Sequence, residues 1–170
     1  MPETPEGLLA WLGALGIETR TVRHAPVFTV AESRELRGGL PGGHSKNLFL
    51  KPSKGDGPFL LAVLEESRKA PVDALARAAG AGRVEMAPAE ALRAVLGVEP
   101  GSVTPFGLVN AAPGSVETVF DAALMRDHEW VHFHPLANHM TTAIRPADLL
   151  RFLNALGHDP RLLDLDGGSG

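Results

Sequence analysis

Lys46 is the first side chain whose type and position suggest chemistry. It opens a predicted strand, and because side chains alternate along a strand it shares a face with Leu48 and Leu50. One interpretation is a lysine whose stem crosses apolar surroundings to reach solvent. The other is a fixed cation at the mouth of a pocket, which could hold a phosphate, a carbonyl oxygen or a hydroxyl.

A glycine- and proline-rich loop is the second candidate. The segment 101–107 reads Gly-Ser-Val-Thr-Pro-Phe-Gly, a composition that predicts a shaped loop without regular structure. Gly101, Pro105 and Gly107 would let a rigid backbone approach a ligand closely and present N–H groups to it, as oxyanion-binding loops do. The alternative is a tight connection between a helix and a strand.

Histidines are the third candidate, and four of the seven lie close together in the sequence: His128, His132, His134 and His139. His132 and His134 would share one strand face, a spacing that occurs in metal sites. The carboxylates that could complete such a set are Asp121, Asp127 and Glu129. Hydrogen-bonded or solvated histidines are the commoner outcome, and no HExxH helix or other specific ligand signature is present. We therefore expect no metal.

Covalent catalysis is disfavoured by the motifs that the sequence lacks. The chain has no cysteine, so it offers neither a thiol nucleophile nor a disulfide framework. It has no Gly-x-Ser-x-Gly elbow, and Ser45 directly follows His44, so the two would point to opposite faces of a strand. Phosphate-loop and dinucleotide fingerprints are absent as well, so we expect no cofactor.

Length, composition and charge narrow the class of protein. With 170 residues, 44% hydrophobic and 21% charged, the chain is typical of one globular domain. Sixteen basic against twenty acidic residues give a net charge of -4, which argues against a DNA-wrapping protein and limits any RNA contact to a local one. No apolar run is long enough for a bilayer, and the acidic start is unlike a secretory signal, so a cytoplasmic protein is expected.

The elements that must position these residues can be read from periodicity and from capping and stop signals. Helices are predicted at 5–15, 29–36, 71–79, 88–96 and 146–156. Strands are predicted at 19–23, 45–50, 59–64, 84–86, 116–120, 130–134 and 141–144. The sequence His24-Ala25-Pro26 ends the first strand, and the turn formers at 52–58 predict a hairpin between the second and third.

This order of elements predicts an α+β (mixed α/β) fold. Helices and strands interleave irregularly, which favours a mixed sheet flanked by helices over a doubly wound arrangement. The segment 59–64 is apolar on both faces, as expected of a central strand. We expect one domain over residues 1–163 and a flexible tail at 164–170.

Three strings together resemble the motif blocks of the YbaK/INS editing superfamily: Gly-His-Ser-Lys-Asn-Leu-Phe-Leu (43–50), Gly-Val-Glu-Pro-Gly-Ser-Val-Thr-Pro-Phe-Gly-Leu (97–108) and Phe-His-Pro-Leu-Ala-Asn (133–138). The strings Lys-Asn-Leu-Phe-Leu and Val-Thr-Pro-Phe-Gly-Leu are similar to the ProXp-ala branch in particular. The resemblance covers nearly the whole chain. It implies a twisted, partly barrel-like mixed sheet surrounded by helices.

The resemblance also implies roles for individual residues. Lys46 is similar to the family's pocket lysine, residues 101–105 to its GxxxP loop, and His134 to its HP-containing strand motif, so Lys46, Gly101 and His134 are the expected catalytic residues. The expected substrate-binding residues are Asn47, Ser102, Thr104, Pro105, Phe106, Gly107 and Asn138.

The reaction implied by the resemblance is hydrolysis of the ester that joins a wrong amino acid to the terminal ribose of tRNA(Pro). Alanine is the expected amino acid, and cysteine, which related enzymes clear, is the alternative. A non-catalytic module that binds tRNA or a synthetase is a further alternative. The implied partners are the acceptor end of tRNA(Pro) and prolyl-tRNA synthetase, with neither a membrane nor DNA.

Overall fold

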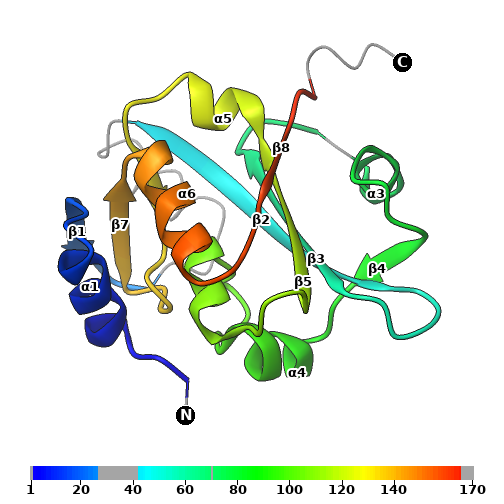
Figure 1. Ribbon diagram of the computed structural model, residues 1–170, viewed down its shortest axis with the longest axis horizontal. Helices are drawn as coiled ribbons and strands as arrows, with labels where there is room; N and C mark the ends of the chain where they lie inside the picture. The colour runs from blue at the N-terminus through cyan, green and yellow to red at the C-terminus, as the bar shows by residue number, and fades with distance from the viewer. Residues whose placement is uncertain (1, 27–41, 70, 166–170) are drawn as a thin grey trace.

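The computed structural model describes residues 2–26, 42–69 and 71–165 (Figure 1). The helix predicted at 29–36 and the tail positions 166–170 lie outside the described residues. The helices are α1 (Pro5–Ala14), α3 (Val72–Ala78), α4 (Ala89–Ala91), the π-helical turn η1 (Leu92–Leu96), the 3-10 helix η2 (Pro105–Asn110), α5 (Ala122–Arg126) and α6 (Pro146–Ala155). Within this part of the chain, none is long and apolar enough to cross a membrane.

The strands of the described segments form one mixed sheet in the order β1-β7-β6-β2-β3-β5-β8, with β4 paired to β2. Their bounds are β1 Thr19–Arg23, β2 Gly43–Pro52, β3 Phe59–Glu65, β4 Val84–Met86, β5 Val116–Asp121, β6 Val131–Phe133, β7 Met140–Ile144 and β8 Arg161–Leu163. The β2–β3 pairing is antiparallel, whereas β2–β6, β3–β5 and β5–β8 are parallel. The predicted mixed sheet and hairpin are therefore confirmed.

Local signals explain the helix ends. Thr4 caps α1, its hydroxyl accepting a hydrogen bond from the backbone N–H of Gly7 at 3.0 Å, and a proline occupies the first turn. Leu8 and Leu12, one turn apart, are buried on the inner face. The helix stops before Gly16, whose φ of 74° is a conformation that glycine adopts without strain.

Two apolar clusters lie on opposite faces of the sheet. In the β2–β3 register Phe49 is opposite Leu61 and Leu50 is opposite Leu60, and directly opposed residues point to the same face. Phe49 and Leu61 join the first cluster, which also takes in α1, α6, η1 and η2. Leu50 and Leu60 join the second cluster, which is covered by α3 and β4. As predicted for the segment 59–64, β3 is buried on both faces.

Five segments differ from the sequence prediction. The predicted helix 88–96 is divided between α4 and the wider η1 turn, and it ends at Gly97 with a φ of 67°. Residues 105–107, expected to be irregular, belong to η2, because Thr104 caps this helix and Pro105 presets the first helical angle. The short elements α5 and β8 were not predicted. Leu165, placed in the expected tail, packs against the second cluster.

Strand β1 is the end of the sheet, since it pairs only with β7 in the described strand order. Four of its five residues are exposed, and Val22 among them keeps 38% of its surface accessible. Arg20 lies 4.2 Å from the centre of the Trp130 ring, measured from its guanidinium carbon, and Arg23 is exposed at the strand's end. The outer edge of the sheet is therefore flanked by cations.

Gly107 tests the close packing of η2 on η1. A Cβ added there would lie 2.9 Å from the Cβ of Leu96, so Gly107→Ala should destabilise the protein by about 1–3 kcal/mol. Gly13→Ala is the matched control, because an added Cβ meets nothing within 4 Å in α1 and the substitution should gain roughly 0.5–1 kcal/mol. Denaturant unfolding measures both, and equal stabilities would contradict the packing.

Candidate active site

Polar side chains gather on one face of the sheet, at the end formed by β1, β7, β6 and the start of β2. Val131 and Phe133 of β6 belong to the first apolar cluster, so His132 between them points to the opposite face. His132 pairs with His44 of β2, and their rings stack with centroids 4.6 Å apart and planes 8° apart. The face away from the first cluster therefore carries the site's histidines.

Lys46 and His134 follow on this same face. The parallel β2–β6 ladder pairs Gly43 with Val131 and His44 with His132. Lys46 and His134 are each two residues further along, so they continue the same register, although β6 itself ends at Phe133. In the β2–β3 ladder Lys46 is opposite Leu64, which confirms that its side chain leaves on the face of the second cluster. No ion pair of Lys46 is found in the part of the chain that the structure describes.

His134 is held in one tautomer. Its Nδ1 lies 2.8 Å from the backbone oxygen of Met140, and since a carbonyl oxygen only accepts, Nδ1 carries the proton. Nε2 is then left as an acceptor. Burial lowers the pKa of His134 from its ordinary 6.5, the bond to Met140 raises it, and the nearby His24 lowers it; the net direction is down. The imidazole is therefore a neutral acceptor at neutral pH.

His24 is a member of this group that the sequence analysis missed. Its Nε2 lies 2.8 Å from the hydroxyl of Thr141, and its ring centroid is 6.3 Å from that of His134. The sequence analysis took His24 for part of the break after β1. The available signal was parity, because His24 continues the alternation of Val22 and so falls on the same face as His134.

Gly101 brings the glycine loop to the β6–β7 connection. It is exposed with a φ of 93°, and a Cβ added to it would lie 3.8 Å from the Nδ2 of Asn138. That connection starts at His134, and Leu136 within it has a φ of 73°, which is rare for a bulky residue. Strained backbone of this kind is concentrated at functional sites. The structure thus brings together Gly101, Asn138 and the turn that begins at His134.

Most of the glycine loop is buried rather than presented. The buried members are Ser102, Thr104, Pro105, Phe106 and Gly107. The Thr104 hydroxyl accepts a hydrogen bond from the N–H of Phe106 at 3.2 Å. The rings of Phe106 and Phe133 pack nearly at right angles, with their centroids 6.0 Å apart. With no exposed surface, Thr104 and Phe106 hold the loop against β6, and Gly101 is the part that a ligand can reach.

Asn47 is not placed beside its neighbour Lys46. It is opposite Val63, a member of the first cluster, so it points to the other face of the sheet. Its Nδ2 lies 3.3 Å from the Ser45 hydroxyl, and its buried Oδ1 has no hydrogen-bond partner among the described residues. Strand alternation alone separates the two adjacent residues.

Two of the three carboxylates considered for a metal set have other partners. Asp121 is bonded to Arg68, and Asp127 to Arg126. Over residues 2–26, 42–69 and 71–165, no group of three or more His, Asp or Glu side chains is arranged to hold a metal ion.

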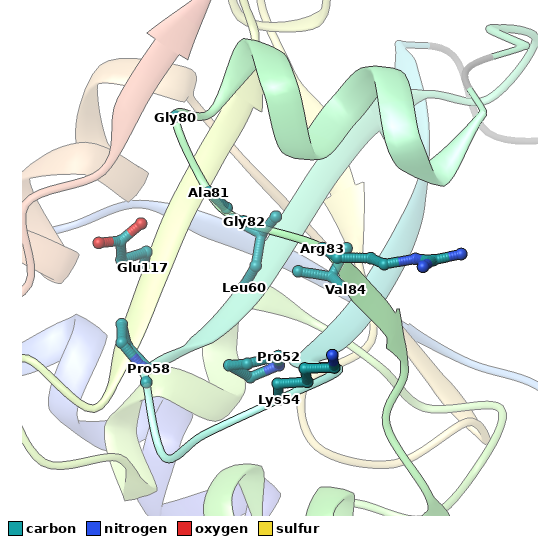
Figure 2. A pocket seen from close by; sticks show the side chains of 11 residues that line it. Pro52, Lys54, Pro58, Leu60, Gly80, Ala81, Gly82, Arg83, Val84 and Glu117 are labelled. Atoms are coloured by element: carbon teal, nitrogen blue, oxygen red, sulfur yellow. The ribbon is translucent and has the colours of Figure 1, made fainter.

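A separate cavity of about 560 Å³ lies at the far end of β2 and β3 (Figure 2). Pro52, Pro58, Leu60 and Val84 give it apolar walls, and Lys54 stands at its rim. None of the predicted site residues lines it. The candidate active site is therefore the polar face at the other end of the sheet.

Fold and site define a mixed α/β domain with a polar candidate site on one face of its sheet. The family model of the aminoacyl-tRNA editing domain matches residues 24–152, and the chain belongs to this family. The resemblance seen in the three motif strings is confirmed.

Individual relatives agree with this assignment. The prolyl-tRNA synthetase associated domain-containing protein 1 of Bos taurus is 40% identical over 158 residues, which are 91% of this chain and 91% of the relative. The prolyl-tRNA editing protein ProX of Acetoanaerobium sticklandii is 28% identical over 163 residues, 96% and 98% of the two chains. A solved structure described as a candidate trans-editing enzyme for prolyl-tRNA synthetase has a TM-score of 0.67 at 20% identity, covering 94% and 93%, and so has the same fold.

The lowered pKa of His134 predicts a specific titration. At pH 6.5 an ordinary histidine is half protonated, whereas His134 should still be mostly neutral. His134 should become protonated only at lower pH. Below pH 6.5 the unfolded chain therefore binds more protons than the folded chain, so the free energy of unfolding should decrease as the pH is lowered. An NMR titration of the ring signals measures this, and a midpoint at or above 6.5 would contradict the arrangement.

Proposed function

We propose that this chain is a trans-editing hydrolase that deacylates mischarged tRNA(Pro), with alanyl-tRNA(Pro) as its preferred substrate. The observation that carries the proposal is the placement of Lys46 and His134 on one sheet face, in the same β2–β6 register. Membership of the aminoacyl-tRNA editing domain family supports the reaction class. The name of the relative ProX, a prolyl-tRNA editing protein, supports the choice of tRNA.

The proposed reaction needs no protein nucleophile. An aminoacyl ester is already activated, so positioning and electrostatic stabilisation are enough to speed its hydrolysis. Lys46 and the backbone of Gly101 hold the substrate and the developing oxyanion. The unprotonated Nε2 of His134 accepts a hydrogen bond from the attacking water, and the vicinal ribose hydroxyl helps to orient that water. Asn138, beside Gly101, completes the polar rim.

Size explains why such an enzyme is needed. A synthetase pocket built for proline cannot strongly reject the smaller alanine by binding alone, so a second, smaller site removes the error. Proline is excluded from this second site by its bulk. The cysteine-clearing enzymes that this chain resembles use a similar scaffold, and cysteinyl-tRNA(Pro) is therefore the alternative substrate.

The proposed partners are the acceptor end of tRNA(Pro) and prolyl-tRNA synthetase, in the cytoplasm. A net charge of -4 suits a protein that touches only the end of the tRNA, because the electrostatic contribution grows with the number of phosphates neutralised. Relatives named as synthetase-associated domain proteins favour a second candidate, a module that binds tRNA or the synthetase without turnover.

The substrate proposal is tested with a deacylation panel of alanyl-, cysteinyl- and prolyl-tRNA(Pro). We expect fast release of alanine, slower release of cysteine and none of proline above the uncatalysed rate. Binding of mischarged tRNA without release would favour the non-catalytic module. Release of proline would show that the site does not select by size.

Lys46→Ala tests the proposed cation. The substitution should lower kcat/KM for alanyl-tRNA(Pro) by about 100- to 1,000-fold while the thermal unfolding midpoint changes little, because the side chain is partly exposed. Lys51→Ala is the matched control, since Lys51 is on the same strand but opposite Glu85, on the other face. Equal activity of the Lys46 variant and the control would refute the role of Lys46.

A further inference from the structure

A buried carboxylate joins three elements next to the candidate site. Asp121, at the end of β5, has a side chain with no exposed surface. Its Oδ2 accepts hydrogen bonds from the N–H of Glu65 at 3.0 Å and from the Nε of Arg68. Its Oδ1 accepts from the N–H of Ala123 and from the Nη2 of Arg68, each at 3.2 Å. One carboxylate thus fixes the end of β3, the turn after it and the start of α5.

Arg68 is the ion-pair partner of Asp121 at this junction. Its side chain is 17% exposed, so both charges are largely removed from water. Separating the partners of a buried ion pair is costly, because each would be left as an uncompensated charge away from water. The two-pronged contact of a guanidinium with a carboxylate also fixes orientation.

On one side, the junction borders the strand of Lys46. Glu65 is opposite Ser45 in the β2–β3 ladder, and the N–H of Glu66 donates to the backbone oxygen of His44 at 3.0 Å. The turn that Arg68 closes is therefore bonded to the residues directly before Lys46. A shift of this turn would move the start of β2.

On the other side, the junction leads to His134. Asp121 caps α5 through Ala123, and the chain that leaves α5 runs into β6. On the way, His128 lies against the start of β2, since a Cβ added to Gly43 would be 2.6 Å from the His128 ring. The same carboxylate is therefore linked to both strands that carry the proposed reacting groups.

We propose that Asp121 and Arg68 are positioning residues that set the separation of Lys46 and His134; this inference rests on the proposed function. Neither residue touches the substrate. Their contribution is geometric, and misplacement of a reacting group by about 1 Å can cost about 100-fold in rate.

The test compares Arg68→Ala and Arg68→Lys with Arg145→Ala. Arg145 forms an ion pair with Glu18, at 2.9 Å, on the β1 side of the sheet, where the two side chains are 39% and 54% exposed. For Arg68→Ala we expect kcat for alanyl-tRNA(Pro) to fall about 10- to 100-fold with KM within about twofold. Arg68→Lys, which keeps the charge near Asp121, should recover part of the loss, and Arg145→Ala should behave as wild type.

An NMR measurement on the free protein separates this inference from the proposed function. In Arg68→Ala the backbone amide signals of both Lys46 and His134 should shift, in addition to those of Glu65 and Ala123. Changes confined to residues 65–68 and 121–123, or an unchanged kcat, would overturn the inference. If the wild type hydrolyses no ester, the proposed function fails, and the amide shifts alone then decide whether Arg68 positions Lys46 and His134. If Arg68→Ala does not fold, the same comparison with Arg68→Lys decides.

Discussion

The structure depends on one strand, β2, being shared by neighbours on both edges. It pairs with β6 at its start, with β3 along most of its length and with β4 at its end. Because side chains alternate strictly, each β2 residue is assigned to one of two surroundings: the first cluster, or the face that changes from polar at His44 and Lys46 to apolar at Leu50. A shift of one residue would exchange the two sets completely. The register of β2 is therefore the constraint that creates the site.

Sequence patterns predicted the elements whose cause is local. Capping residues, glycine stops and alternation located α1, β1, β4 and α6 to within a residue or two. The same reasoning put Lys46 with Leu48 and Leu50, and His134 with His132. It missed η2, because proline and glycine were taken as loop signals although Thr104 caps a helical turn there. It missed β8, because three residues carry little periodicity and this strand is defined by its pairing with β5.

Long-range contacts lay beyond the reach of sequence patterns. The pairing of β2 with β6 joins residues nearly ninety positions apart, and it alone puts Lys46 and His134 in one register. The hydrogen bond from His134 to Met140, which selects the tautomer, spans the turn that contains Leu136 with its φ of 73°. Strand alternation already predicts that Asn47 and Lys46 point to opposite faces, but the resemblance of the motif string placed both residues in the site.

Among the described residues β1 is the outer strand of the sheet, and this position has a consequence for how the protein behaves at high concentration. Unpaired backbone groups on an outer strand invite the strand of another molecule, and the result is aggregation. Here the exposed Val22 stands between Arg20 and Arg23, and charged side chains in these positions act as gatekeepers against the pairing of another strand. The segment Thr-Arg-Thr-Val-Arg therefore protects the protein from aggregation. Replacing its two arginines with neutral residues would lower the solubility of the protein.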